Sequence, residues 1–70
     1  MKTIFTTDLS REGGGCYIYE TIYLVEQYGI YAVLQSYKVT GQTNNAEIFL
    51  LISTTNYEKA MEKYKEVGGI

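Results

Sequence analysis

Two segments of alternating side chains, residues 17–26 and 30–40, flank the short link Gln27-Tyr28-Gly29, and this arrangement limits the fold more than any other feature. Both segments are rich in Tyr, Ile, Val and Thr, which favour strands. A short link that ends in glycine is typical of a hairpin turn that needs a positive φ. We therefore predict a long antiparallel hairpin.

The length of the link decides which side chains share a face. A three-residue link at 27–29 sets Ile22 opposite Leu34, and it separates aliphatic side chains from tyrosines and valines. A two-residue link sets Ile22 beside Gln35 and mixes polar with apolar positions. Because a slip of one residue moves a whole strand's side chains to the other face, the cleaner separation favours the three-residue link.

Two further strands are predicted at residues 4–7 and 47–53 from their apolar and β-branched content. Residues 8–15 contain Gly13-Gly14-Gly15, and we predict a mobile loop there. Residues 41–45 have the composition of a turn between the last two strands.

A helix is predicted at residues 56–67. Thr55 and Glu58 fit a capping box, and Gly68-Gly69 supplies a left-handed stop. The apolar positions recur with helical spacing: Tyr57, Ala60, Met61, Tyr64 and Val67. This helix has one apolar side and one charged side.

The prediction is one small α+β domain spanning residues 1–70: a four-stranded antiparallel β-meander (β-β-β-β-α) with the C-terminal helix packed on one face. The helix is expected to cover the aliphatic face, Ile18, Ile22, Leu24, Ala32, Leu34, Ile48, Leu50 and Ile52. Glu20 would lie at the margin of that face and pair with Lys38. Cys16 would be a buried thiol on the same side.

A single helix leaves the second face of the sheet bare. Its aromatic side chains form the predicted partner-binding set: Tyr17, Tyr19, Tyr23, Tyr31, Tyr37 and Phe49. Strand spacing gives this patch an area of roughly 300–400 Å². Apolar patches of that size on a small protein usually mark an interface.

The composition limits the kinds of metal, cofactor and catalytic site that the chain can form. The chain has 70 residues, a net charge of −2, no histidine and one cysteine. The usual zinc and haem ligand sets, the serine and cysteine catalytic dyads and an internal disulfide are therefore excluded, and we expect neither a cofactor nor enzymatic activity. A core of this size contributes only about 3–5 kcal/mol net, which favours a partner. The start of the chain lacks the apolar region of a signal peptide and the sequence has no membrane-length apolar run, so we expect a cytoplasmic protein.

Nucleic acid is a weaker expectation. Aromatic side chains on a sheet can stack single-stranded bases. However, residues 1–55 carry three basic side chains (Lys2, Arg11 and Lys38) against five acidic ones, and no basic cluster exists to hold phosphates.

The resulting hypothesis is a non-enzymatic protein-binding module, a small inhibitor or adaptor that docks through the tyrosine-rich face. Small, acidic chains without motifs are typical of phage and mobile-element products that block host defence, anti-CRISPR proteins among them, and such a product would act in the host cytoplasm. One alternative is a small bacterial structural protein that homodimerises through this face. Another is a single-stranded nucleic-acid binder.

Overall fold

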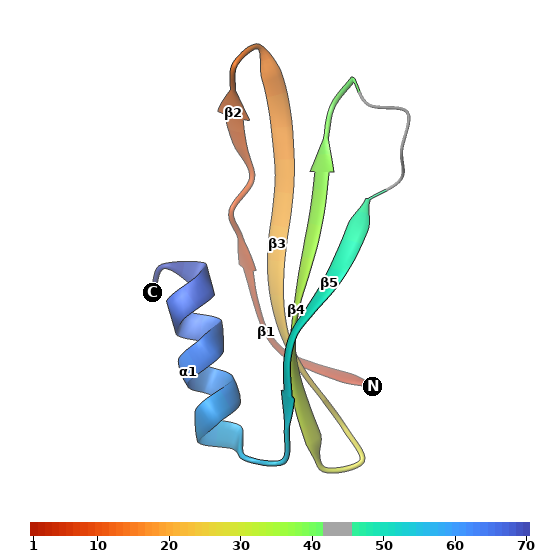
Figure 1. Cartoon of the computed structure of the whole chain (residues 1–70), viewed down its shortest axis with the longest axis vertical. Helices are drawn as coiled ribbons and strands as arrows, with labels where there is room; N and C mark the ends of the chain where they lie inside the picture. The colour runs from red at the N-terminus through yellow and green to blue at the C-terminus, as the bar shows by residue number, and fades with distance from the viewer. Residues whose placement is uncertain (42–45) are drawn as a thin grey trace.

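The computed structural model describes residues 1–41 and 46–70, which form an antiparallel sheet with one helix against it (Figure 1). The elements are β1 (Lys2–Asp8), β2 (Arg11–Gly13), β3 (Cys16–Gln27), β4 (Ile30–Val39), β5 (Glu47–Thr54) and α1 (Tyr57–Gly68). The strand order is β1-β3-β4-β5, and β2 pairs with the first part of β3. The predicted α+β class, the meander order and the C-terminal helix are confirmed. The turn predicted at residues 41–45 lies, apart from Gly41, outside the described residues.

The predicted mobile loop at residues 8–15 is wrong for most of its length. Arg11–Gly13 is strand β2, in which Gly13 lies opposite Cys16. The intervening Gly14 and Gly15 have φ values of 60° and 82°. Two consecutive positive φ values define a tight two-residue hairpin turn, which glycine adopts without steric cost. The glycines therefore close a second hairpin.

The central hairpin has a two-residue turn, so the predicted register is wrong by one residue. Gln27 lies opposite Ile30, and Ile22 lies opposite Gln35 instead of Leu34. Tyr28 and Gly29 both take positive φ, 53° and 79°. This turn type matches the right-handed twist of the flanking strands. The only sequence feature that favours the three-residue turn is the cleaner separation of side chains between the two faces.

Strand β5 contains a bulge that changes its faces. Ile52 lies opposite Val33, but Leu50 lies opposite Leu34, so Leu51 is an extra residue in the pairing with β4. An extra residue inverts the alternation on the rest of the strand. Ile48 and Leu50 therefore lie on the opposite face from Ile52, contrary to the prediction that all three share one face.

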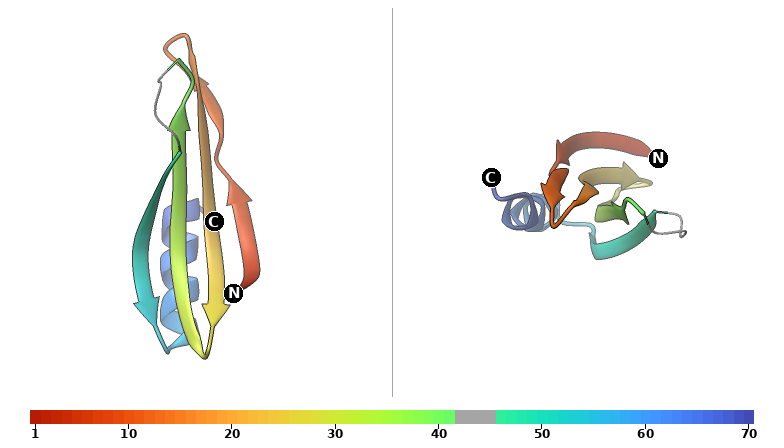
Figure 2. Two further views of the ribbon diagram at one scale, coloured as in Figure 1. Left: turned by 90° about the vertical axis from the view of Figure 1, so that its right-hand side faces the viewer. Right: turned by 90° about the horizontal axis from the view of Figure 1, so that it is seen from above.

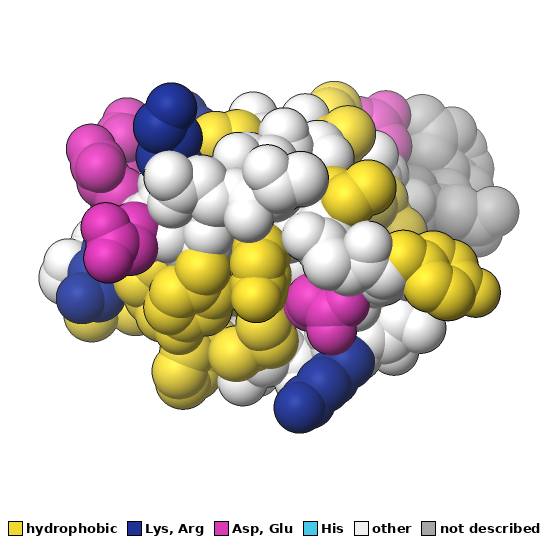
Figure 3. Space-filling model, turned by 90° about the horizontal axis from the view of Figure 1, so that it is seen from below, with side chains coloured by type: hydrophobic (Ala, Val, Ile, Leu, Met, Phe, Trp, Pro, Cys, Tyr) yellow, Lys and Arg dark blue, Asp and Glu magenta, His cyan; other side chains and the backbone are white. Residues whose placement is uncertain are grey.

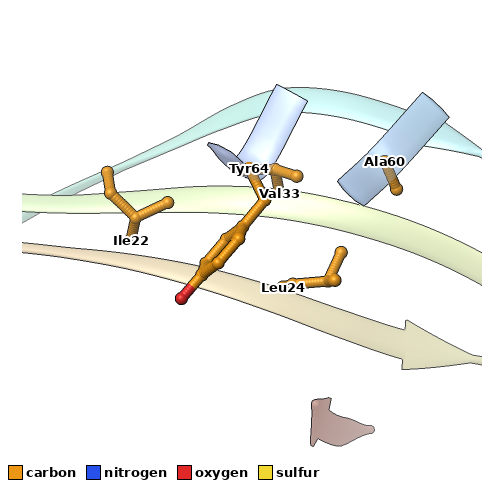
Figure 4. Close-up of a cluster of buried hydrophobic side chains, with 5 residues drawn as sticks. All are labelled: Ile22, Leu24, Val33, Ala60 and Tyr64. Atoms are coloured by element: carbon orange, nitrogen blue, oxygen red, sulfur yellow. The ribbon is translucent and has the colours of Figure 1, made fainter. Parts of the chain in front are cut away.

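The core lies between α1 and the half of the sheet nearer the Tyr28–Gly29 turn (Figures 1 and 4). Its fully or almost fully buried side chains are Ile22, Leu24 and Val33 from the sheet and Ala60 and Tyr64 from the helix. Met61 and Val67 pack around them, as the helical spacing predicts. On β4, Val33 lies on the helix side and is buried, whereas the sequence predicts Ala32 and Leu34 there. The difference arises because the register is shifted by one residue.

Both ends of α1 are capped, although the N-cap is Asn56 and not the predicted Thr55. The Asn56 side chain accepts hydrogen bonds from the backbone amides of Glu58 and Lys59, at 2.9 and 3.2 Å. Asparagine caps at least as well as threonine, and here it lies directly before the first helical turn. Gly69 takes the left-handed conformation at the other end, as predicted.

The molecule is elongated, with extents of 40 × 23 × 15 Å, and the helix runs along only part of the sheet (Figures 1 and 2). Near the end of α1, the side chain of Thr7 lies 3.9 Å from the position that a Cβ on Gly68 would occupy. Thr7 pairs with Ile22, so the rows beyond Ile22, toward the β2–β3 turn, lie past the end of the helix. In the part of the chain that the structure describes, one side of the sheet thus has a helix-covered half and a bare half, and the other side has no helix over it.

Candidate docking surface

The sheet face turned away from α1 is the candidate docking surface, and we call it the open face. The register assigns to it Tyr17, Tyr19, Tyr23 and Val25 from β3, Leu34 and Lys38 from β4, and Ile48 and Leu50 from β5. Figure 2 (left) looks onto this face, with the helix behind the sheet. No helix of the described chain lies over it.

Large apolar side chains on the open face are exposed to an unusual degree. Ile48 is 70%, Leu50 62% and Tyr19 51% exposed. The rings of Tyr17 and Tyr19, two residues apart on β3, lie 4.7 Å apart between centroids and form one aromatic surface. Ile48 and Leu50 lie close together on β5, and Lys38 and Ser36 of β4 lie between them and the two tyrosines. Single exposed apolar residues are normal, whereas groups of them are typical of an interaction site.

A shallow hollow of about 240 Å³ lies within this face. It is lined by Met1, Thr3, Tyr23, Val25, Leu34, Ser36 and Ile48. Pockets for small molecules are usually enclosed and have volumes of about 300–1,000 Å³. The hollow is smaller, and most of the residues that line it are apolar.

The six predicted partner-binding residues are divided between the two faces. Tyr17, Tyr19 and Tyr23 lie on the open face, whereas Tyr31, Tyr37 and Phe49 lie on the helix side. The prediction that all six share one face, which follows from the three-residue turn, is therefore wrong. Tyr31 packs against the core, and its ring meets that of Tyr57 edge-on at 5.2 Å. Whether any of these side chains binds a partner stays a prediction.

Sequence reasoning missed Leu34, Ile48 and Leu50, which make up most of the exposed aliphatic surface of the open face. One signal was available. Residues 48–52 are an unbroken apolar run, so this strand presents apolar side chains to both faces whatever its register. A run without alternation on a strand beside a single helix already indicates apolar exposure.

Glu20 is the buried charge of the sheet, on the helix side beyond the end of α1. Its Oε1 atom accepts a hydrogen bond from Arg11 Nη1 at 2.6 Å, and its Oε2 atom accepts one from Gln35 Nε2. The predicted pair with Lys38 is wrong, because the register puts Lys38 opposite Tyr19 on the other face. Both carboxylate oxygens are engaged in joining β2, β3 and β4, which favours a structural role over catalysis.

Cys16 is exposed, and the prediction of a buried thiol is wrong. It shares the face of Ile18 and Glu20, as expected, but it lies at the start of β3, farther from α1 than either. Sharing a face with the core therefore does not bury it.

A second apolar surface is the groove between β1 and α1. It has a volume of about 480 Å³, and its apolar lining comes from Phe5, Met61, Tyr64 and Ile70. Figure 3, which views the end that carries the Tyr28–Gly29 turn, shows hydrophobic side chains gathered between groups of charged ones. The Phe5 and Tyr64 rings lie 6.1 Å apart here. Tyr64 is only 4% exposed, so this groove lies at the margin of the core, where β1 meets α1.

Within residues 1–41 and 46–70, no three metal-ligating side chains gather in one place. Over the same residues, no helix has the length and apolar character needed to cross a bilayer.

No protein-family model matches the sequence, and no curated protein or solved structure is significantly similar to it. The geometry of the open face is therefore the basis on which a function can be inferred.

Proposed function

We propose that the protein is a non-enzymatic binding module that docks onto another protein through the open face. The observation that carries this proposal is the exposure of Ile48, Leu50 and Tyr19 on a sheet face that the helix leaves bare. Burial of apolar surface contributes about 25 cal/mol per Å², so side chains of this size supply a useful binding energy when a partner covers them. Tyrosines at the border provide contact area together with a polar hydroxyl group.

A protein partner fits this surface better than a nucleic acid. Among the described residues of the open face, Lys38 is the one basic side chain, and the Asp8 carboxylate lies on the same face opposite Thr21. Binding of a phosphate backbone requires several clustered cations. The open face instead combines aliphatic and aromatic side chains, as the cores of protein interfaces do.

The sequence-based hypothesis of a small inhibitor or adaptor is one form of this proposal. A sheet face of this kind acts by covering a surface on its partner. A phage-encoded inhibitor of a host defence enzyme, such as an anti-CRISPR protein, stays a prediction based on the size and charge of the chain.

Site-specific photo-crosslinking tests the proposal. A photoreactive phenylalanine replaces Tyr19 on the open face, and in the matched control it replaces Tyr28, which is 91% exposed at the hairpin tip. We expect a defined crosslinked protein from position 19 and not from position 28, and loss of binding of that purified protein by Tyr19→Ala with Leu50→Ser. Equal crosslinking at both positions, or unchanged binding by the double variant, would contradict the proposal.

A further inference from the structure

The outer edge of β5 is a different kind of surface from the open face. In the described part of the chain, β5 pairs only with β4, so the backbone amides and carbonyls along its other side face outward. Glu47, Ile48, Phe49 and Leu50 are all exposed, and three of these four consecutive side chains are apolar. Proteins usually protect such edges with lysine, proline, a bulge or a covering segment. The bulge at Leu51 lies after Glu47–Leu50 and leaves this first half of β5 regular. Between Ile48 and Thr54, β5 contains no charged residue and no proline.

We propose that this edge pairs with β5 of a second copy of the chain, antiparallel about a two-fold axis, to form one continuous sheet. An exposed strand edge accepts only another extended backbone, so the chemistry of the occupant is that of a strand. Pairing of a strand with itself is isologous and closes at two copies. This inference goes beyond the proposed function, because it depends on the backbone of an edge and not on the open face.

The side chains of β5 determine the register of this pairing. A two-fold axis perpendicular to the sheet keeps each side chain on its own face, so the axis must pass midway between the two copies of one residue. With the axis at Phe49, the two Phe49 rings face each other on the helix side, and Ile48 lies opposite the partner's Leu50 on the open face. Glu47 then lies opposite the partner's Leu51, and the two Glu47 carboxylates are about 13 Å apart along the strands.

The bulge at Leu51 limits the pairing to about five residues of each copy, because a bulge interrupts the ladder and increases the local twist. Such an interface is at the small end of specific interfaces, below about 1,200 Å². We therefore expect a dimer that forms at micromolar concentrations and dissociates on dilution.

The other edge of the sheet is a poorer match for β5. Strand β1 carries Lys2 and Asp8 at its ends, and the register shifts between Thr3 and Phe5 in its middle. Pairing of β1 with β5 is also heterologous and leads to open filaments instead of a closed dimer. Self-pairing of β5 avoids both problems.

Sedimentation velocity of the full chain over a dilution series tests the proposal. Phe49→Lys puts two ammonium groups opposite each other at the axis and should weaken the dimer by about tenfold or more. Phe5→Lys is the matched control, because Phe5 is 46% and Phe49 44% exposed and both lie on edge strands. We expect the control to dimerise like the original chain, with circular dichroism showing that both variants fold.

Crosslinking identifies the edge directly. On a Cys16→Ser background, Phe49→Cys should give a disulfide-linked dimer on mild oxidation, because opposed strand residues lie at disulfide distance, whereas Phe5→Cys should not. A chain that is monomeric at every concentration overturns the inference and leaves the open-face proposal intact. A dimer that Tyr19→Lys disrupts while Phe49→Lys does not also overturns it, because that result indicates packing through the open faces.

Discussion

The Nη1 atom of Arg11 lies 2.6 Å from the Oε1 atom of Glu20, so a charge on β2 is fixed to a buried charge on β3. The Glu20 side chain is 11% exposed and the Arg11 side chain 53%. The pair therefore stabilises the sheet mainly because the Arg11 guanidinium compensates the desolvation cost of the buried Glu20 carboxylate. The pair also ties β2, which belongs to the Gly-rich segment before β3, to β3 itself.

Loss of that cation should destabilise the fold. We expect Arg11→Ala to lower the free energy of unfolding by about 1–2 kcal/mol, less than for a fully buried pair because Arg11 is half exposed. Lys38→Ala is the control, and it should change stability by less than about 0.5 kcal/mol. Urea unfolding measures both. A larger loss with Lys38→Ala would restore the Glu20–Lys38 pair of the sequence-based prediction.

The turn residue Tyr28 has a φ of 53°, which is unfavourable for a side chain of its size. Tyr28→Asn should raise stability by about 0.5–1 kcal/mol, because Asn-Gly is the preferred pair for this turn. Tyr28→Val should act in the opposite direction, since β-branched residues avoid positive φ. Thermal unfolding compares the three chains. Identical stabilities would mean that the turn does not have this conformation.

The hydroxyl group of Tyr64 forms a hydrogen bond with the Thr7 side chain, which ties α1 to β1. Tyr64→Phe should cost about 1 kcal/mol, and Thr7→Val a similar amount. The double variant should cost less than the sum, because each substitution removes the same bond. A double-mutant cycle from denaturant unfolding checks this coupling. Strict additivity would mean that the hydrogen bond contributes nothing.

The hydroxyl group and the backbone amide of Ser10 donate hydrogen bonds to Asp8 and lower the pKa of its carboxyl group. A lowered pKa gives a contribution to stability that is present above the unfolded-state pKa and is lost as the pH falls through the folded-state pKa. In Ser10→Ala the hydroxyl contribution, which is the larger, disappears. We therefore expect the pKa of Asp8, measured by NMR titration, to rise toward its ordinary value. An unchanged titration would contradict this assignment.

Much of the fold could be predicted from local patterns, but the faces of β4 and of the first half of β5 could not. The spacing of Ala60 and Tyr64 predicts the helix, because both residues belong to one element and their spacing does not depend on how strands pair. The hairpin register depends on a single turn residue, Tyr28, whose side chain gives no signal for positive φ. The preference for separating polar from apolar positions failed because Gln35 is needed beside Ile22 to bind Glu20.

The candidate site was predicted in part for the same reason. Tyr17, Tyr19 and Tyr23 were assigned to the bare face, since β3 keeps its alternation throughout. The aliphatic members Ile48 and Leu50 depend on the bulge at Leu51, and a bulge has no marker in an unbroken apolar run. The pairing of β4 with β5 therefore determines which apolar side chains of β5 lie on the open face.

The register places Leu34 on the open face and Val33 in the core, and the position of the open face depends on this placement. Nuclear Overhauser effects from methyl-labelled leucine and valine measure this directly. We predict contacts from the Leu34 methyl groups to Tyr23 and Ile48, and from the Val33 methyl groups to Tyr64. Contacts between Leu34 and Tyr64, with none to Tyr23, would contradict the register and the open face together.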